Sequence, residues 1–278
     1  MRPLLVLDGD SFAHRAYHAL PKTMRRRNGR PGNALIGFTN MLLRLWQDER
    51  PRTVLVAWDT LDVPTYRHLA LEEYQGGRVF DAELLEQLDL LPSLVTSAGF
   101  ACAKEPGYEA DDFLAAAAAG EEAAGGHVLV ATSDRDAFQL ASLHTTILQP
   151  ARGGAPPARI GPADVRERYG VDPERVPDFI ALRGDPSDRI PGARGIGEKR
   201  AADLLAQFGS LEAMLAEGRF AAEADALRLY RRIATMDREA PLPLLPDTAP
   251  TWVEAAEYAR ELGLPGVASR LVEAQTWT

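Results

Sequence analysis

Three short apolar runs, each followed within three residues by an aspartate, constrain the fold of this chain more than any other feature. The runs cover residues 4–7, 53–58 and 127–131, and the aspartates are Asp8, Asp59 and Asp134. An apolar run without polar alternation is typical of a strand buried on both faces. Helical patterns over residues 34–47 and 111–119 separate the runs, so the sequence predicts a parallel α/β sheet with right-handed crossovers.

The aspartates that follow the strands are expected to meet at one edge of the sheet, because the carboxyl ends of parallel strands line the ligand crevice. Each aspartate alone can also be read as a turn or helix-cap residue. Two further segments, residues 107–112 and 184–188, add acidic side chains. Together these segments give nine candidate carboxylates: Asp8, Asp59, Glu109, Asp111, Asp112, Asp134, Asp136, Asp185 and Asp188.

The net charge of −9 can be assigned to this cluster. The chain has 40 acidic and 31 basic residues, so the nine carboxylates account for the whole excess. Two like charges about 4 Å apart repel by roughly 4 kcal/mol at an effective dielectric of 20, so the cluster needs bound cations to stay ionised. Oxygen ligands favour Mg²⁺ or Mn²⁺ over zinc. Pairs of such ions are the usual device for phosphodiester hydrolysis, and this is the chemistry that the spacing predicts.

Composition argues against several other classes of protein. The 278 residues are 46% hydrophobic and 26% charged, as in one large or two small globular domains. No apolar run reaches the 18 residues needed to cross a bilayer, so we expect no membrane partner. The single cysteine, Cys102, cannot form an internal disulfide, which favours a cytoplasmic location. His14 and His18 have metal-site spacing, but packing or surface roles are the simpler interpretation.

Several blocks in fixed order are similar to one known family. They are LLVLDGDSFAHRAYHALP (4–21), VAWD (56–59), PGYEADDFLA (106–115), TSDRDAFQL (132–140), RYGVDP (168–173) and ALRGDPSDRIPGARGIGEKRAADLL (181–205). Over residues 4–215 the chain resembles the 5′→3′ exonuclease domain of bacterial DNA polymerase I and the related flap endonucleases. No polymerase domain follows these blocks, so we expect a stand-alone member.

The resemblance implies a fold and an activity. The fold is a PIN-like parallel sheet core with a helical arch insertion, over residues 1–175 with the arch at about 60–95. A helical region with a helix-hairpin-helix motif follows over residues 176–278. The activity is a divalent-metal-dependent 5′→3′ exonuclease or structure-specific flap endonuclease with two metal ions. The expected substrate is DNA with a 5′ flap, a nick or a single-stranded 5′ end, cut by a monomer associated with the nucleoid.

The nine carboxylates all fall on the positions of the family's two-metal site. By this resemblance Asp8, Asp59, Glu109, Asp111 and Asp112 would hold the metal that activates water, with part of the second site. Asp134, Asp136, Asp185 and Asp188 would complete the second site, some of them through bridging waters.

Arch residues are expected to contact the single strand: Arg67 and Arg78 by clamping phosphate, and Tyr74 by stacking on a base. The family usually has a lysine where this chain has Gln75, and that lysine helps to neutralise the scissile phosphate. Gln75 cannot supply a charge, so Arg78, with Arg67, would take that catalytic role. The alternative is a slower or differently selective enzyme.

Two other segments are candidates for duplex contacts. Residues 192–199 are typical of a helix-hairpin-helix turn, in which Gly195 and Gly197 let backbone N–H groups approach a phosphate, while Lys199 and Arg200 add charge. In the family this element often binds K⁺. The basic loop formed by Arg25, Arg26, Arg27 and Arg30 is either a backbone contact or a solvated loop.

Two rival functions remain open at the level of the sequence. One is a phosphatase with Asp8 as nucleophile and Asp10 as acid, since Asp8-Gly9-Asp10 resembles the D-x-D of haloacid-dehalogenase-type enzymes. That function would leave the acids at 109–112 and 185–188 unexplained. The other is a non-catalytic protein that binds DNA structures, given the missing lysine.

Overall fold

The chain is built around one six-stranded sheet in the computed structural model, which describes residues 2–77, 79–151 and 155–277. The strand order is β3-β2-β1-β4-β5-β6, parallel throughout except for the antiparallel edge strand β6. The α/β prediction is therefore confirmed. The strands are β1 (Leu4–Asp8), β2 (Thr53–Ala57), β3 (Ala101–Ala103), β4 (Val128–Ala131), β5 (Thr145–Gln149) and β6 (Ala158–Ile160).

Twelve α-helices and four 3₁₀ turns occur in the same described ranges. The helices are α1 (Gly9–Ala19), α2 (Asn33–Glu49), α3 (Tyr66–Ala70), α4 (Ala82–Ser97), α5 (Ala110–Ala123), α6 (Pro162–Tyr169), α7 (Val176–Arg183), α8 (Glu198–Phe208), α9 (Leu211–Ala216), α10 (Ala224–Ala234), α11 (Trp252–Glu261) and α12 (Pro265–Ala274). The 3₁₀ turns are Asp136–Leu140, Pro173–Arg175, Ala221–Glu223 and Gln275–Trp277.

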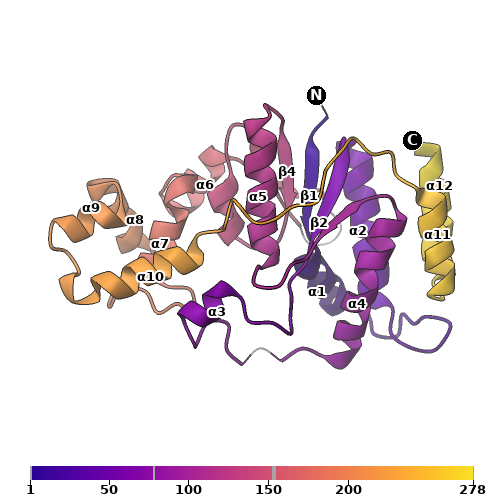
Figure 1. Ribbon diagram of the computed structural model, residues 1–278, viewed down its shortest axis with the longest axis horizontal. Coiled ribbons are helices and arrows are strands. Elements are labelled where there is room, and N and C mark those ends of the chain that lie inside the picture. Colours follow the sequence, from indigo (N-terminus) through magenta and orange to yellow (C-terminus); the bar gives the residue numbers. More distant parts are fainter. Residues whose placement is uncertain (1, 78, 152–154, 278) are drawn as a thin grey trace.

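Helices cover both faces of the sheet. Along each central strand, alternate side chains point into one hydrophobic core or into the other. Leu4 and Val6 of β1 pack with α5, α7, α8 and α10. Leu5 and Leu7 point the other way, into a core with α2, α4, α11 and α12. Figure 1 shows these two layers on either side of the strands. Because both faces are buried, the strands read as unbroken apolar runs.

The strand register brings three chain segments to one edge. Asp8 at the end of β1 lies opposite Ala57 of β2, and Leu7 lies opposite Ala131 of β4. Thr132 therefore follows β4 at the level of Asp8, and Asp59 lies two residues beyond Ala57 at the same edge. The three strands that the sequence predicts are β1, β2 and β4. It does not predict β5, nor β3 and β6, which have three residues each and carry little pattern.

The helices at the C-terminal end do not form one separate unit. Helices α7, α8 and α10 extend the core beside α5, whereas α11 and α12 lie at the other end of the molecule (Figure 1). The proline-rich stretch 240–250 runs between them without regular structure. Trp252 anchors α11, with edge-on contacts to Trp46 and Phe100 at 5.4 Å between ring centroids.

The arch insertion is shorter than the predicted range of 60–95. Helix α4 buries Leu84, Leu91 and Leu94 against the core, because its apolar residues recur at helical spacing. The part that crosses the end of the sheet covers residues 60–77 and 79–81 and contains the short helix α3 (Figure 1). We call residues 60–81 the insertion.

Candidate active site

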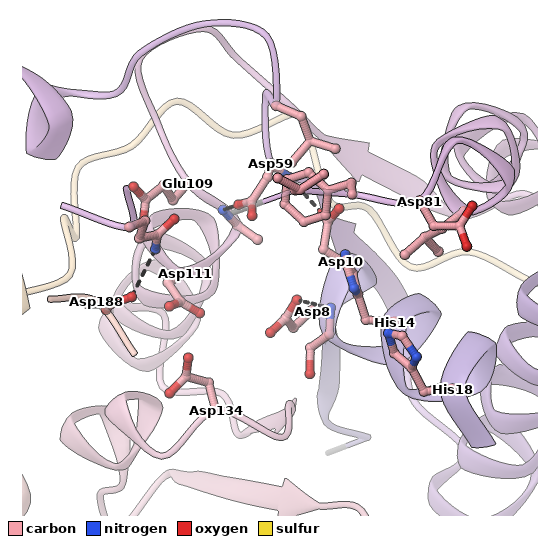
Figure 2. A pocket seen from close by; sticks show the side chains of 17 residues that line it. Asp8, Asp10, His14, His18, Asp59, Asp81, Glu109, Asp111, Asp134 and Asp188 are labelled. Atoms are coloured by element: carbon pink, nitrogen blue, oxygen red, sulfur yellow. Dashed lines mark hydrogen bonds between the residues drawn. The ribbon is translucent and has the colours of Figure 1, made fainter. Parts of the chain in front are cut away.

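Carboxylates from six chain segments surround one cavity of about 510 Å³ at the carboxyl edge of the sheet. We call it the main acid pocket. Figure 2 shows side chains from β1, the β2 end, α5, the β4 end and the α7–α8 turn pointing toward this shared space. Six of the nine predicted carboxylates line it, with Asp10 and Asp81 in addition: Asp8, Asp59, Glu109, Asp111, Asp134 and Asp188.

A second cavity of about 470 Å³ adjoins the first and shares Asp8 and Asp134 with it. We call it the side pocket. Asp136 and Asp185 line this cavity together with Arg135 and Arg183. Asp185 accepts hydrogen bonds from the backbone N–H of Ser187 at 2.8 Å and from Nη2 of Arg183 at 3.2 Å. The predicted carboxylates thus fall into two connected groups.

Asp8 is held from both sides. Its Oδ1 accepts from the backbone N–H of Ser11 at 2.9 Å, and its Oδ2 accepts from Oγ1 of Thr132 at 2.7 Å. Gly9 is required between Asp8 and Asp10 because a Cβ there would lie 2.5 Å from the ring of Trp58. The strand end therefore presents its carboxylate in one fixed direction.

Asp10 and Asp59 are linked through the backbone. The N–H of Asp59 donates to Oδ2 of Asp10 at 2.8 Å, and Oδ1 of Asp59 accepts from the N–H of Ala110 at 2.7 Å, at the start of α5. The sequence suggests a role for Asp10 only in the phosphatase alternative. Its place two residues after a strand end, on the first turn of α1, is the signal that could have added it to the site.

Glu109 caps α5 at the border between the main acid pocket and the insertion. Oγ1 of Thr65 donates to its Oε1 at 2.8 Å, and the hydroxyl of Tyr74 donates to its Oε2 at 3.0 Å. Thr65 and Tyr74 both belong to the insertion. The insertion therefore positions a carboxylate of the pocket.

Burial and mutual repulsion disfavour the ionised form of these carboxylates. Burial, with the charges of Asp59 and Asp134, raises the pKa of Asp8 to about 7. Burial, followed by the neighbouring carboxylates, also raises the pKa of Asp10, Asp111 and Asp136 well above the usual range. Perturbed groups of this kind concentrate at functional sites. A bound cation would instead favour the ionised form, because it stabilises the negative charge of the carboxylates.

The donor set fits a hard cation. The lining side chains offer carboxylate oxygens, and within the described ranges no three His, Cys, Asp or Glu side chains already stand close enough to hold an ion by themselves. Mg²⁺ binds in this way, through one or two carboxylates while keeping several waters. His14 and His18 also line the pocket, but their rings are 6.4 Å apart and His14 packs edge-on against Phe80.

Asp112 does not belong to the candidate ligands, contrary to the prediction. Its side chain is fully buried, and its two oxygens accept from Nη1 and Nη2 of Arg67 at 2.8 and 2.7 Å. Oδ1 also accepts from the backbone N–H of Asp237 at 2.9 Å. On the helical spacing of α5, Asp112 faces the core while Asp111 faces the pocket.

The predicted DNA contacts of Arg67 and Tyr74 are wrong for the same reason. Both side chains are only 3% exposed. Arg67 is held by Asp112 and by the carbonyl of Ile233, to which its Nε donates at 2.8 Å. The hydroxyl of Tyr74 donates to Glu109, so both side chains already have partners within the protein. Arg78, predicted for phosphate clamping and catalysis, lies outside the described residues.

The basic loop splits into two kinds of arginine. Arg26 is buried, donates to the carbonyl of Pro31 at 3.1 Å and pairs with Glu86, so it is structural rather than a duplex contact. Arg25 and Arg27 are exposed. The predicted turn residues Gly195, Gly197, Lys199 and Arg200 are exposed between α7 and α8, with Gly195 at φ 74°.

Comparisons with known proteins agree with this geometry. Residues 3–170 match the family model "5′-3′ exonuclease, N-terminal resolvase-like domain", and residues 171–255 match "5′-3′ exonuclease, C-terminal SAM fold". The chain is 40% identical over 256 residues to DNA polymerase I of Mycobacterium tuberculosis, covering 88% of this chain and 28% of the relative. It is 40% identical over 242 residues to DNA polymerase I of Bacillus caldotenax, covering 86% and 27%. The chain thus spans less than a third of the length of these relatives.

Solved structures share the fold at low sequence identity. The bacteriophage T5 flap endonuclease, in a complex with DNA and metal ions, has a TM-score of 0.71 at 19% identity, covering 98% of this chain and 99% of that one. T5 5′-exonuclease with bound zinc has a TM-score of 0.71 at 20% identity, with the same coverage.

The described part of the chain contains no helix long and apolar enough to cross a membrane. The family models cover residues 3–255 between them, and the nuclease prediction is confirmed over the phosphatase alternative. This chain belongs to the 5′–3′ exonuclease family.

Proposed function

We propose that this family member cuts DNA at 5′ flaps, nicks and single-stranded 5′ ends, using two Mg²⁺ or Mn²⁺ ions and leaving 5′-phosphate and 3′-hydroxyl ends. The observation that carries the proposal is the convergence of carboxylates from six chain segments on the main acid pocket. The T5 structures that contain divalent metal ions and DNA support it. We further propose that the protein acts as a monomer at the nucleoid.

The proposed ligands fall into two groups. Asp8, Asp59, Glu109 and Asp111 would hold the first ion in the main acid pocket. Asp134, Asp136, Asp185 and Asp188 would hold the second at the border with the side pocket, some through water. Such ions supply a water of lowered pKa and neutralise charge on the leaving oxygen.

The chain's own residues orient these ligands and admit the strand. Thr132 and the N–H of Ser11 fix the carboxylate of Asp8. Thr65 and Tyr74 fix Glu109. Because Thr65 and Tyr74 belong to the insertion, movement of the insertion by a bound strand would change the position of Glu109. The proposed site therefore couples substrate entry to ligand geometry.

The duplex side of the substrate is assigned to the α7–α8 turn. Gly195 and Gly197 leave backbone N–H groups accessible, and Lys199 and Arg200 are exposed beside them at the start of α8. We propose that this turn binds duplex phosphates and takes a K⁺ ion. Replacing K⁺ by Na⁺ should weaken binding of nicked duplex and leave single-strand binding unchanged.

The decisive experiment uses a 5′-labelled flap and a nicked duplex with Mg²⁺, Mn²⁺ or a chelator. The wild-type protein should release short 5′ products only with metal, and Asp134→Ala should not. Glu257→Ala, which removes an exposed acid on α11, is the matched control and should cut normally. Flap binding without cleavage in both metals would favour the non-catalytic DNA-binding alternative.

A further inference from the structure

The insertion and the α7–α8 turn touch beside the main acid pocket. Nε2 of Gln75 donates to Oδ1 of Asp188 at 3.1 Å, and the backbone N–H of Gln75 donates to the carbonyl of Asp188 at 3.2 Å. Both residues line the main acid pocket. The next residue, Arg189, is therefore held where the insertion meets the mouth of the pocket.

Arg189 has a backbone conformation that few side chains favour. Its φ is 57°, in the left-handed region where Gly, Asn and Asp are the common residues. Reciprocal backbone hydrogen bonds of 2.8 Å between Asp185 and Ile190 close the turn and hold that conformation. Arg189 therefore occupies a position whose backbone conformation favours Gly, Asn or Asp.

The guanidinium of Arg189 lies against two glycines of the insertion. A Cβ built at Gly76 would stand 3.0 Å from its Nη1, and a Cβ at Gly77 would stand 3.0 Å from its Nη2. Gly76 and Gly77 line a cavity of about 360 Å³, bounded also by Asp59 and Glu109 of the main acid pocket. The charged head therefore lies beside two glycines that line this cavity.

The charge of Arg189 is available to a ligand. Its side chain is exposed, and among the residues with described positions no carboxylate lies within ion-pair distance of it. Two neighbouring arginines already have acidic partners. Arg67 pairs with Asp112, and Arg183 pairs with Asp185 at 3.2 Å. A planar guanidinium with free N–H donors matches the geometry of a phosphate.

We propose that Arg189 binds a backbone phosphate of the DNA strand at the mouth of the main acid pocket. It supplies from the α7–α8 turn the positive charge that Gln75 does not supply from the insertion. The proposal rests on the proposed function, since it assigns a contact with the same substrate.

The test compares Arg189→Asn with Arg189→Lys. Asn removes the charge and suits the left-handed backbone, so the variant should melt at or above the wild-type temperature. In the cleavage-deficient Asp134→Ala background, Arg189→Asn should weaken flap binding about tenfold and reduce the slope of log K against log [KCl] by about 1. Arg189→Lys should keep the slope. Arg270→Ala, an exposed arginine on α12, should match the parent protein.

In the cleavage-competent protein, Arg189→Asn should raise KM more than it lowers kcat. Adding Gln75→Lys to it should recover part of the loss, because a lysine at position 75 stands beside the same phosphate. An unchanged salt slope and KM in Arg189→Asn, or no recovery in the double variant, would overturn the inference. A wild-type protein that cuts nothing would instead refute the proposed function, while the binding slopes would still report on Arg189.

Discussion

Arg67 and Asp112 form a bidentate ion pair in the interior, with N–O distances of 2.8 and 2.7 Å. Arg67 belongs to the insertion, Asp112 to α5, and the carbonyl of Ile233 at the end of α10 completes the contact. This ion pair ties the base of the insertion to both the sheet core and the helical C-terminal part. The pair therefore has a structural role, although both residues carry charges that the sequence assigned to chemistry.

Removing one member of this pair should destabilise the protein strongly. Asp112→Ala removes both short hydrogen bonds of the buried Arg67 guanidinium and leaves it only the longer ion pair with Glu109 at 3.5 Å, which costs about 3–5 kcal/mol. Urea unfolding measures the loss, and the double variant Arg67→Met/Asp112→Leu should lose much less. Arg228→Ala, which breaks an exposed pair with Glu212, is the control and should change stability little. If Asp112→Ala were as stable as the wild type but bound Mg²⁺ more weakly, Asp112 would be a metal ligand and not a structural residue.

Metal should stabilise the protein more as pH rises. The pKa of Asp8 is about 7 in the folded protein because of burial and its acidic neighbours, against 3.8 ordinarily. Between these values the folded, metal-free protein binds more protons than the unfolded chain, so this contribution to stability is lost as pH rises toward 7. The pKa values of Asp10 and Asp111 shift in the same direction.

Melting curves at pH 5 to 8, with chelator and with Mg²⁺, test this expectation. The increase in Tm on adding Mg²⁺ should be larger at pH 8 than at pH 5, since the ion offsets repulsion between ionised carboxylates. Asp8→Asn should flatten the dependence. An increment that stays constant with pH would show that these carboxylates do not face the ion.

Asp10 should act by positioning Asp59. Its Oδ2 accepts the N–H of Asp59 at 2.8 Å. Asp10→Asn keeps an acceptor oxygen there and should cleave within a few-fold of the wild-type rate, whereas Asp10→Ala leaves the N–H unpaired and should lower kcat about tenfold. Cleavage rates across a Mg²⁺ titration measure both effects. If Asn and Ala were equally impaired and both required more Mg²⁺, the charge of Asp10 would matter and not its hydrogen bond.

The exposed and the buried arginines of the basic loop should differ in their effects on DNA binding and on stability. Arg25 and Arg27 are exposed, so replacing both by Ala should weaken duplex binding and reduce its salt slope by about 1 to 2. Arg26 is buried against Glu86, so Arg26→Ala should lower Tm and leave the slope unchanged. Binding titrations at several KCl concentrations, with melting curves for each variant, decide the assignment. Equal slopes for Arg25→Ala/Arg27→Ala and wild type would leave the loop without a DNA contact.

Periodicity alone determined the strands that form the centre of the sheet. Residues 4–7, 53–58 and 127–131 are apolar without alternation because both faces of each strand are buried, so the sequence pattern directly reports the environment. The convergence of Asp8, Asp59 and Asp134 follows from parallel pairing and needed no coordinates. The acidic segments 107–112 and 184–188 added Glu109, Asp111 and Asp188 as candidates, and the main acid pocket contains all of them.

Only the tertiary structure decided which charged side chain faces the pocket and which faces the core. Asp111 and Asp112 are adjacent and chemically identical, yet α5 turns by about 100° between them, so one lines the pocket and the other pairs with Arg67. Arg26 lies in the basic loop and Arg67 in the insertion, but partners far along the chain bury both. A local pattern records the charge of a residue. Whether that charge meets solvent, a ligand or a counter-charge depends on segments that folding brings together from a distance.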